Sequence, residues 1–365
     1  IFAFSHRINP DIKFLSQVAT YAVCPISLVL LLELWVPMIQ LAILHLAVFF
    51  QLGWTCHTLM VRSRPSASHL TEFYLWVAAG GVLGGAFNGF IAPILFNGLY
   101  EYPIALALAV VLIQQREQRK GSWLSDVAMG VAGVLVLYGM TFFVPPFLHY
   151  NAVAMGLYAM LVVACFLAID RQLLYGILIG ALMVIGPSFK PDTAEQILRV
   201  RNFFGAKRVV DHNNFHGLYH GTTLHGMQNM STKDRDEPLT YYNTNGPVGR
   251  IFKEFSGPKT KQSIAVVGLG AGTMASYGQP GQTITYYEID PQIINIATDP
   301  KYFTFIADSK AKVNIVQGDA RLELAKTPPA SYDIIFLDAF SSDSIPIHLL
   351  TTQAIEMYVS KLKPG

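Results

Sequence analysis

The sequence predicts a multi-pass α-helical membrane domain over residues 1–189, followed by an α/β domain built on a parallel sheet. The membrane prediction rests on composition. Of 365 residues, 52% are hydrophobic and 14% are charged, against roughly 25% charged residues in soluble domains, and the apolar excess lies before Lys190. The α/β prediction rests on the remainder of the chain, where short β-branched runs end in glycine or an acid and alternate with helix-like segments.

The membrane domain is expected to contain seven apolar helices, because a hydrocarbon core about 30 Å thick requires roughly 20 apolar residues per helix. The runs are Phe14–Leu32, Val36–Met60, Phe73–Leu95, Ile104–Ile113, Leu124–Val144, Ala152–Ile169 and Leu173–Ile185. Arginine and lysine concentrate in alternate connections, for example at Arg62 and Arg64, which predicts that these connections are cytoplasmic. Seven spans would put the next domain on the opposite side, so we expect one short run, at Ile104 or Leu173, not to cross.

Two features inside these runs carry structural expectations. Polar side chains such as His45 and Gln51 are expected to form hydrogen bonds between helices, although ionisable groups at membrane depth also raise a functional hypothesis. A row of glycines is expected to allow close packing of another helix. These glycines are Gly80, Gly81, Gly84, Gly85 and Gly89.

The α/β domain, over residues 263–365, is organised around a glycine motif. The run S-I-A-V-V leads directly into Gly268, Gly270 and Gly272. This pattern is typical of a strand followed by a tight turn, where missing side chains let a ligand approach the backbone. The chain begins at Ile1 without a methionine and ends before the last strand that such a sheet needs. We therefore expect it to be a piece of a longer protein.

Three acids are expected to share one rim of this sheet. Glu288 ends the next apolar run, 20 residues after Gly268, the spacing at which a carboxylate takes both hydroxyls of a ribose. Asp319 and Asp338 end two further runs, and the carboxyl ends of parallel strands lie along one edge. The strands are Thr283–Tyr287, Val313–Val316 and Tyr332–Leu337, with helix-like segments at Pro291–Thr298 and Leu322–Ala325.

The glycine motif restricts the class of nucleotide. The lysine and serine of a phosphate-binding loop are missing, which argues against a nucleoside triphosphate. G-L-G-A-G also lacks the third glycine of the dinucleotide motif, since Met274 and Ala275 stand where it would fall. A dinucleotide stays open, and an adenosyl sulfonium compound is favoured. No basic stripe with interleaved aromatic residues occurs, so no nucleic-acid partner is expected.

Residues 190–262 are expected to form a small β-rich lid over the glycine turn. The β-prone runs Phe203–Val210 and Gly217–Leu224 flank Asn213-Asn214, which predicts a hairpin. Histidines at positions 216, 220 and 225 raise the possibility of a metal, but neither a carboxylate nor a cysteine completes a familiar ligand set. We expect no metal, and Gln228 with Tyr241 or Tyr242 to reach the pocket.

From Lys190 onwards, about half of the chain resembles the spermidine and spermine synthases, the polyamine aminopropyltransferases, in the form fused to bacterial membrane segments. The resemblance rests on G-L-G-A-G, Y-E-I-D, G-D-A, L-D-A-F-S-S-D, L-H-G-M-Q and D-E-P-L-T-Y-Y. It implies a Rossmann-like fold of the class I methyltransferase type. It also implies roles for single residues. Cofactor-binding residues would be Gly268, Gly270, Gly272, Glu288, Asp319, Ala320 and Gln228; catalytic residues would be Asp338, Asp343, Tyr241 and Tyr242.

The resemblance implies decarboxylated S-adenosylmethionine as co-substrate and methylthioadenosine as product. The acceptor would be a polyamine of the putrescine or spermidine type, and the protein an integral multi-pass protein of the bacterial inner membrane with a cytoplasmic catalytic region and a possible homodimer. Two positions depart from the family. Ala271 replaces an aspartate that holds the amino group of the donor, and Gly205 replaces a glutamine of the lid.

The chemistry expected at the rim is attack by an amine on the carbon next to a sulfonium. Asp338 can accept the amine proton and Asp343 can bind an ammonium, although Asp343 also suits a helix cap. Tyr241 or Tyr242 can orient the nucleophile. Two alternatives stay open: an S-adenosylmethionine-dependent methyltransferase, favoured by Ala271, and a polyamine transport or sensing protein whose nucleoside domain binds without turnover.

Overall fold

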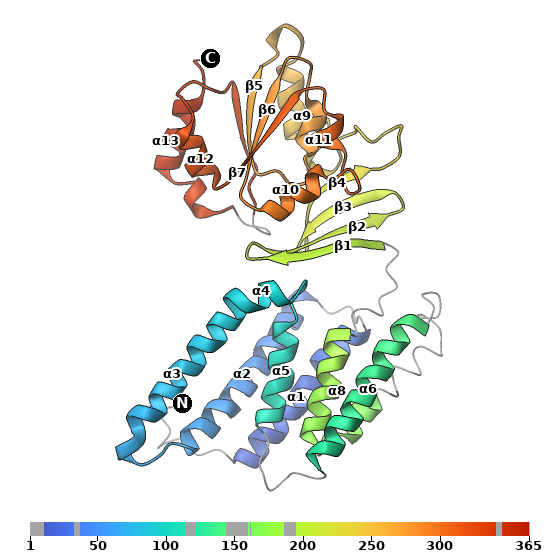
Figure 1. Cartoon of the computed structure of the whole chain (residues 1–365), viewed down its shortest axis with the longest axis vertical. Coiled ribbons are helices and arrows are strands. Elements are labelled where there is room, and N and C mark those ends of the chain that lie inside the picture. Colours follow the sequence, from blue (N-terminus) through green and yellow to red (C-terminus); the bar gives the residue numbers. More distant parts are fainter. Residues whose placement is uncertain are drawn as a thin grey trace. The chain divides into compact units, whose positions relative to one another are not determined.

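The computed structural model describes residues 11–32, 37–113, 122–143, 160, 162–185, 195–340 and 345–364. The chain divides into two compact units (Figure 1). One comprises Ile1–Asn88 and Leu99–Pro191, and the other comprises Gly89–Gly98 and Asp192–Gly365.

The first unit is helical, as the apolar runs predict. Its helices are α1 (Ile12–Leu32), α2 (Met38–Arg62), α3 (Leu70–Ala86), α5 (Glu101–Leu112), α6 (Trp123–Phe143) and α8 (Gln172–Ile185). After α3 the chain passes through a π-helical turn, Phe87–Ile91, into α4 (Ala92–Leu95). Half of the sixth predicted run lies outside the described residues, and residues 160 and 162–167 are helical.

Three helical segments among the described residues are long and apolar enough to cross a membrane, judged by length and composition alone. They are Met38–Arg62, Ala67–Leu95 and Trp123–Met140. Large apolar side chains on them point outward, including Ile39, Phe49 and Trp76. The two short runs form shorter helices, Glu101–Leu112 and Gln172–Ile185. Outward-facing apolar side chains are what a lipid environment favours.

Two of the polar side chains inside the helices bond to a neighbouring helix as expected, whereas His57 and Asn88 bond to the carbonyls of Gly53 and Gly84, four residues earlier. A ring nitrogen of His45 lies 2.9 Å from the hydroxyl of Tyr102, linking α2 to α5, and Gln51 donates to the carbonyl of Leu15 on α1 over 3.3 Å. Among the described residues no helix packs against the glycine row, contrary to the expectation. A Cβ added at any of these glycines would meet no atom within 4 Å, and α3 has no buried residue.

The second unit begins with an antiparallel lid sheet of four strands in sequential order. Its strands are β1 (Glu195–Asn202), β2 (Gly205–His212), β3 (Phe215–His220) and β4 (Thr223–Asn229). The hairpin at Asn213-Asn214 is confirmed, with φ of 54° and 70°, as tight two-residue hairpin turns require. The predicted strand Gly217–Leu224 is wrong, because a second turn at Gly221 divides it and produces β4.

The remainder of this unit is a parallel sheet covered on both faces, which is a Rossmann-like arrangement (Figure 1). The strands β5 (Ser263–Val267), β6 (Thr283–Glu288), β7 (Lys312–Gln317) and β8 (Ile334–Leu337) lie in the order β7-β6-β5-β8. Alternate residues of β5 enter two separate cores, as the period of a strand requires. Ile264 and Val266 pack in one, and Ala265 and Val267 in the other.

The helices are divided between the two faces. The core containing Ile264 includes residues of α9 (Pro247–Glu254), α10 (Pro291–Thr298) and α11 (Phe305–Asp308). The core containing Ala265 includes residues of α12 (Ala320–Lys326) and α13 (Thr352–Lys361). Both helix-like segments expected between the strands are therefore confirmed as α10 and α12. This division leaves the carboxyl ends of the strands as the open edge.

A buried ion pair joins the lid sheet to the parallel sheet. The ammonium of Lys207, on β2, has a fully buried side chain and pairs with the carboxylate of Asp290. Asn202 bridges the two, accepting from Lys207 and donating to Asp290 over 2.6 Å. Asp290 also accepts from the backbone N–H of Gln292 and so caps α10. Separating the pair would leave a buried charge without its counter-charge, which is costly. The ion pair therefore favours the arrangement in which the two sheets meet at this point.

Replacing Lys207 with methionine is expected to destabilise the second unit by about 3–5 kcal/mol, because the carboxylate of Asp290 stays buried without its counter-charge. Adding Asp290→Asn should recover much of this loss, since asparagine keeps an oxygen for the helix cap. Equilibrium urea unfolding of the full chain in detergent checks this. Lys259→Met, which breaks an exposed pair with Glu254, is the control and should change little. Overlapping curves for Lys207→Met and the unchanged chain would contradict the prediction.

Candidate active site

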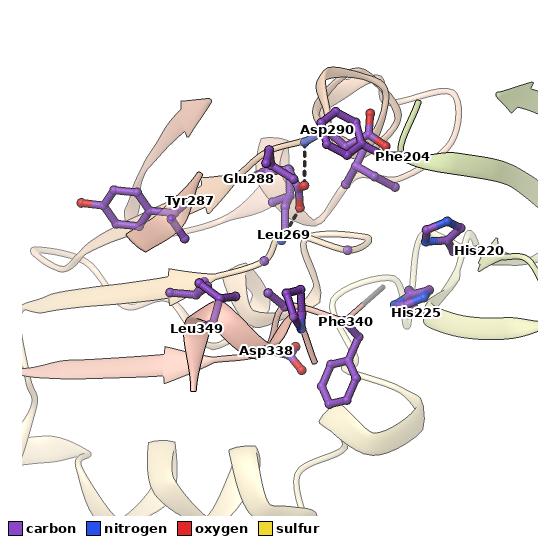
Figure 2. Close-up of a pocket in the computed structure, with 18 of the residues that line it drawn as sticks. Phe204, His220, His225, Leu269, Tyr287, Glu288, Asp290, Asp338, Phe340 and Leu349 are labelled. Carbon is purple, nitrogen blue, oxygen red and sulfur yellow. Dashed lines mark hydrogen bonds between the residues drawn. The ribbon is translucent and has the colours of Figure 1, made fainter. Parts of the chain in front are cut away.

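A cavity of about 400 Å³ lies at the carboxyl edge of the parallel sheet. The strand order is β7-β6-β5-β8, so β6 lies on one side of β5 and β8 on the other. The loops that follow β5 and β8 therefore run in opposite directions and leave a crevice between them. Ligands of open α/β sheets bind at such a point. Figure 2 shows the side chains around the cavity, with Glu288 and Asp338 near its middle. The lid sheet contributes the wall that carries His220 and His225.

Gly268 directly follows β5, and its missing side chain lets the backbone lie close to Asp338 at the rim of the cavity. Its φ is +96°, a conformation that side chains other than glycine rarely adopt. A Cβ at this position would lie 2.5 Å from the carbonyl oxygen of Asp338. Gly268 and Gly270 both line the cavity. Gly272 does not line it and instead begins the 3₁₀ turn Thr273–Tyr277 with φ of +80°.

Glu288 ends β6 with its carboxylate turned back to the glycine turn. One oxygen accepts from the N–H of Leu269 over 3.0 Å, and the other accepts from the N–H of Asp290 over 2.8 Å (Figure 2). Burial raises the pKa of this carboxyl group, and these two backbone donors counteract the rise. Each oxygen keeps lone-pair capacity for a hydroxyl, so the group is held ready to bind a diol.

Asp319 and Ala320 line one end of the cavity. Asp319 accepts from the N–H of Leu322 over 3.1 Å and so caps α12. Its other oxygen lies 3.0 Å from a ring nitrogen of His348. Together with Leu349 they form one end of the cavity, whose lining is apolar apart from a few polar atoms. Such an end suits a flat heterocycle.

Asp338, at the end of β8, is the most perturbed acid of the cavity. Burial raises its pKa to about 6, while the hydroxyl of Tyr242, which donates to its Oδ2, counteracts the rise. The hydroxyl of Tyr241 lies 3.0 Å from that of Tyr242, which gives a chain of hydrogen bonds. Burial raises the pKa of Tyr241 to about 12, so both tyrosines stay protonated at neutral pH. A carboxylate with a pKa near 6 is suited to proton transfer near neutrality.

Tyr241 and Tyr242 owe their position to the short 3₁₀ turn Thr240–Tyr242. Thr240 has a φ of 59°, and the hydroxyl of Tyr277 donates to the carbonyl of Tyr242 over 2.5 Å. Both tyrosines line the cavity, as the sequence predicts. Asp343, the remaining predicted catalytic residue, lies outside the described residues.

Gln228 does not line the cavity. It is fully buried, and its amide nitrogen donates to the carbonyl of Arg235 and to the hydroxyl of Thr304, while its oxygen accepts from the N–H of Thr304. These bonds use the amide to tie β4 to the loop before α11. Gln228 therefore joins two segments of the second unit, and we do not propose it as a ligand-binding residue.

Sequence reasoning missed one wall of the cavity. Phe203, Phe204, His220 and His225 all line it, and the histidines had been considered only as metal ligands. Their rings lie side by side, with centroids 5.8 Å apart. Among the described residues, no group of three or more histidines, cysteines and acids is placed to hold a metal. The sequence H-G-T-T-L-H-G carried the signal, because a two-residue turn at its second and third positions places both histidines near one end of a hairpin.

The two departures from the family pattern have steric counterparts. A Cβ on Gly205, whose φ is +115°, would lie 2.3 Å from Nε2 of His220, so the imidazole occupies the space that a side chain at 205 would need. Ala271 is fully buried against the lid sheet, and a Cβ on Gly226 would lie 2.7 Å from its methyl group. A larger residue at 271 would have to push the lid away.

No family model matches the chain. The curated relatives include a probable polyamine aminopropyl transferase of Bifidobacterium longum, 27% identical over 169 residues, which are 46% of this chain and 34% of that protein. A polyamine aminopropyltransferase of Vibrio vulnificus is 35% identical over 101 residues, 26% of this chain and 32% of that protein. An eEF1A lysine and N-terminal methyltransferase of Xenopus laevis is 32% identical over 90 residues, 24% of this chain and 13% of that protein.

The solved structures include two spermidine synthases. A probable spermidine synthase from Corynebacterium glutamicum has a TM-score of 0.37 and 20% identity, covering 44% of this chain and 58% of that chain. A spermidine synthase in complex with the transition-state analogue AdoDATO has a TM-score of 0.33 and 15% identity, covering 43% and 51%. The chain spans about a third or less of the length of the curated relatives it matches.

Gly268→Ala is expected to weaken binding of methylthioadenosine by tenfold or more, because the added methyl group collides with the carbonyl of Asp338 and strains the turn. Isothermal titration of the full chain in detergent measures this. Gly281→Ala is the matched control, since Gly281 also has a positive φ but open space around its Cβ position and lies outside the cavity. Equal losses in both variants would show that backbone strain, and not the rim, causes the effect.

Proposed function

We propose that this protein is a membrane-bound polyamine aminopropyltransferase. It transfers an aminopropyl group from an adenosyl sulfonium donor to the amine of a polyamine of the putrescine or spermidine type and releases methylthioadenosine. The observation that carries the proposal is Asp338, a half-buried carboxylate with a pKa of about 6 that faces the same cavity as Glu288. The sequence similarity to polyamine aminopropyltransferases over the second unit supports it.

The residues of the cavity fit the adenosyl part of such a donor. Glu288 has two fixed oxygens for the ribose hydroxyls, and Gly268 leaves room for the nucleoside at the backbone. Asp319, Ala320 and Leu349 would hold the adenine. The donor supplies a carbon made electrophilic by the neighbouring sulfonium, and the protein supplies position and a base.

Asp338 is the proposed base. Free amines are protonated at pH 7, so the acceptor must lose a proton before or during attack. Asp338 takes that proton, while the hydroxyl of Tyr242 holds the carboxylate in one orientation. Tyr241 supports Tyr242 by hydrogen bond and offers a ring face to a cationic acceptor. Asp343 would bind a second ammonium group of the polyamine.

The helical unit would anchor the enzyme in a bilayer, in the bacterial inner membrane with the catalytic region on the cytoplasmic side. The support is the set of three long apolar segments and the outward-facing apolar side chains on them. The lipid bilayer and the polyamine are thus its partners, and a homodimer is compatible with this arrangement.

A methyltransferase that uses S-adenosylmethionine is the second candidate. Two observations favour it: the 32% identity over 90 residues to a methyltransferase, and the buried Ala271, which offers no charge to a donor amine. The products separate the two functions, because methyl transfer releases S-adenosylhomocysteine and aminopropyl transfer releases methylthioadenosine.

Asp338→Asn is expected to lower turnover by about 10²- to 10⁴-fold, because asparagine cannot accept the amine proton. Release of methylthioadenosine in the presence of a polyamine, followed by mass spectrometry, measures the effect. Asp333→Asn is the control, because Asp333 precedes the same strand and binds backbone N–H groups at its opposite end. Turnover close to that of the unchanged enzyme would rule out Asp338 as the base.

The pH profile of turnover is expected to rise through about pH 6 and then level off. Asp338 is active only when ionised, and its pKa is about 6, so activity is lost as the pH falls below that value. Tyr242→Phe should move the inflection to higher pH, because removing the hydrogen bond to the carboxylate disfavours its charged form. Initial rates between pH 5 and 9 test both points. An unchanged inflection in Tyr242→Phe would show that Tyr242 does not affect the pKa of Asp338.

A further inference from the structure

The cavity has a second end that the adenosyl part of a donor does not fill. In Figure 2, His220 and His225 lie on the opposite side of Glu288 and Asp338 from Leu349. We name this region the lid end and define it as Phe203, Phe204, His220, His225 and Tyr241, all of which line the cavity. If Glu288 holds the ribose and Leu349 contacts the adenine, the sulfonium substituent extends toward the lid end.

The lid end offers no free carboxylate among the described residues. The acids that line the cavity are Glu288, Asp290, Asp319 and Asp338. Asp290 is the nearest acid in sequence to Glu288, but its charge is matched by the buried ammonium of Lys207, and Asn202 and the N–H of Gln292 also bind it. Asp338 is bound by Tyr242 and reserved for the reacting amine. An ammonium group at the lid end therefore meets no counter-charge.

The polar groups of the lid end are two imidazoles and the hydroxyl of Tyr241, and an imidazole can bind either an ammonium or a carboxylate. His220 donates one N–H to the carbonyl of Phe204, and burial, followed by the charge of Lys207, lowers its pKa. When neutral, its other nitrogen accepts a hydrogen bond. When a nearby anion favours the form that has taken a proton from solvent, the same nitrogen donates one. His225 stands beside it, with ring centroids 5.8 Å apart. The pair suits a zwitterionic amino-acid group better than a bare ammonium.

We propose that the lid end also admits the amino-acid group of intact S-adenosylmethionine, so that the protein transfers a 3-amino-3-carboxypropyl group as well as an aminopropyl group. This inference rests on the proposed function, because it uses the same base and the same electrophilic carbon. A carboxylate at the lid end would repel the donor carboxylate and so select the decarboxylated donor. The described residues lack that repulsive element and place two imidazoles there instead.

The bond changes balance as in aminopropyl transfer. The lone pair of the acceptor nitrogen forms a bond to the methionine-side methylene carbon attached to sulfur. The bond between that carbon and sulfur breaks, and its electron pair neutralises the sulfonium to give methylthioadenosine. Asp338 takes the proton that the nitrogen loses. The acceptor leaves with the 3-amino-3-carboxypropyl group, and no oxidant or reductant takes part.

The donor comparison is the first arm of the test. The full chain in detergent is incubated with S-adenosylmethionine or its decarboxylated form, with and without polyamines, and both nucleoside and acceptor products are identified by mass spectrometry. Methylthioadenosine from S-adenosylmethionine, with an acceptor heavier by a 3-amino-3-carboxypropyl group, is the expected result. Turnover of the decarboxylated donor alone would overturn this inference and leave the proposed function standing. S-adenosylhomocysteine would overturn both.

Binding provides an arm that does not need turnover. His220→Gln and His225→Gln should each weaken binding of S-adenosylmethionine by about tenfold, the scale of one hydrogen bond to a charged group. Neither should change the affinity for methylthioadenosine, which has no amino-acid group. His216→Gln is the control, since His216 lies on the same sheet but its ring bonds the carbonyl of Tyr302 and does not line the cavity.

A reversal variant completes the design. His225→Asp puts a carboxylate at the lid end and should shift the donor preference toward decarboxylated S-adenosylmethionine by at least tenfold, with affinity for methylthioadenosine as a check on folding. If neither donor turns over, the proposed function and the transfer of this group both fail, and the binding arm decides only the inference that the lid end holds the amino-acid group. Equal affinity of the unchanged chain and all histidine variants for S-adenosylmethionine would overturn it.

Discussion

The narrow contact between the ends of β5 and β8 sets the geometry of the whole site. Gly268 fits against the carbonyl of Asp338 only because it lacks a side chain, and its turn then aims the N–H of Leu269 at Glu288. The proposed base, Asp338, and Glu288, the carboxylate proposed to bind the ribose, are therefore both positioned by one backbone contact. Since β5 and β8 are neighbours that the chain reaches from opposite directions, the cavity opens between them. The lid sheet closes it from above the glycine turn.

The rim of the sheet could be predicted from the sequence because each of its acids ends or closely follows a strand that can be recognised along the chain. Acids that end consecutive parallel strands must share an edge, so Glu288, Asp319 and Asp338 come together once the strands are recognised. The glycine motif identifies β5 independently. The lid end could not be predicted in this way. The strand register and the turn at Gly221 decide which side chains of β3 and β4 face the cavity. Gln228 shows the consequence, because its side chain is buried and bonds Thr304 instead of reaching the cavity.

The helical unit shows the same division. Long apolar runs predict helices because the backbone must satisfy its own hydrogen bonds where water is excluded. Each run is helical over most of its described residues. The sequence does not say which face of a helix meets its own chain. The glycines of α3 form a face that nothing in the described chain covers, whereas His45 and Gln51 point to neighbouring helices. Composition determines the element, and packing determines its partners.

The contact between Gly205 and His220 links two positions that lie on adjacent strands. A Cβ at 205 would fall 2.3 Å from Nε2 of the imidazole, so a side chain there would force the ring to turn away. Whether an imidazole stands at this wall of the cavity therefore depends on a glycine of the neighbouring strand that does not itself line the cavity.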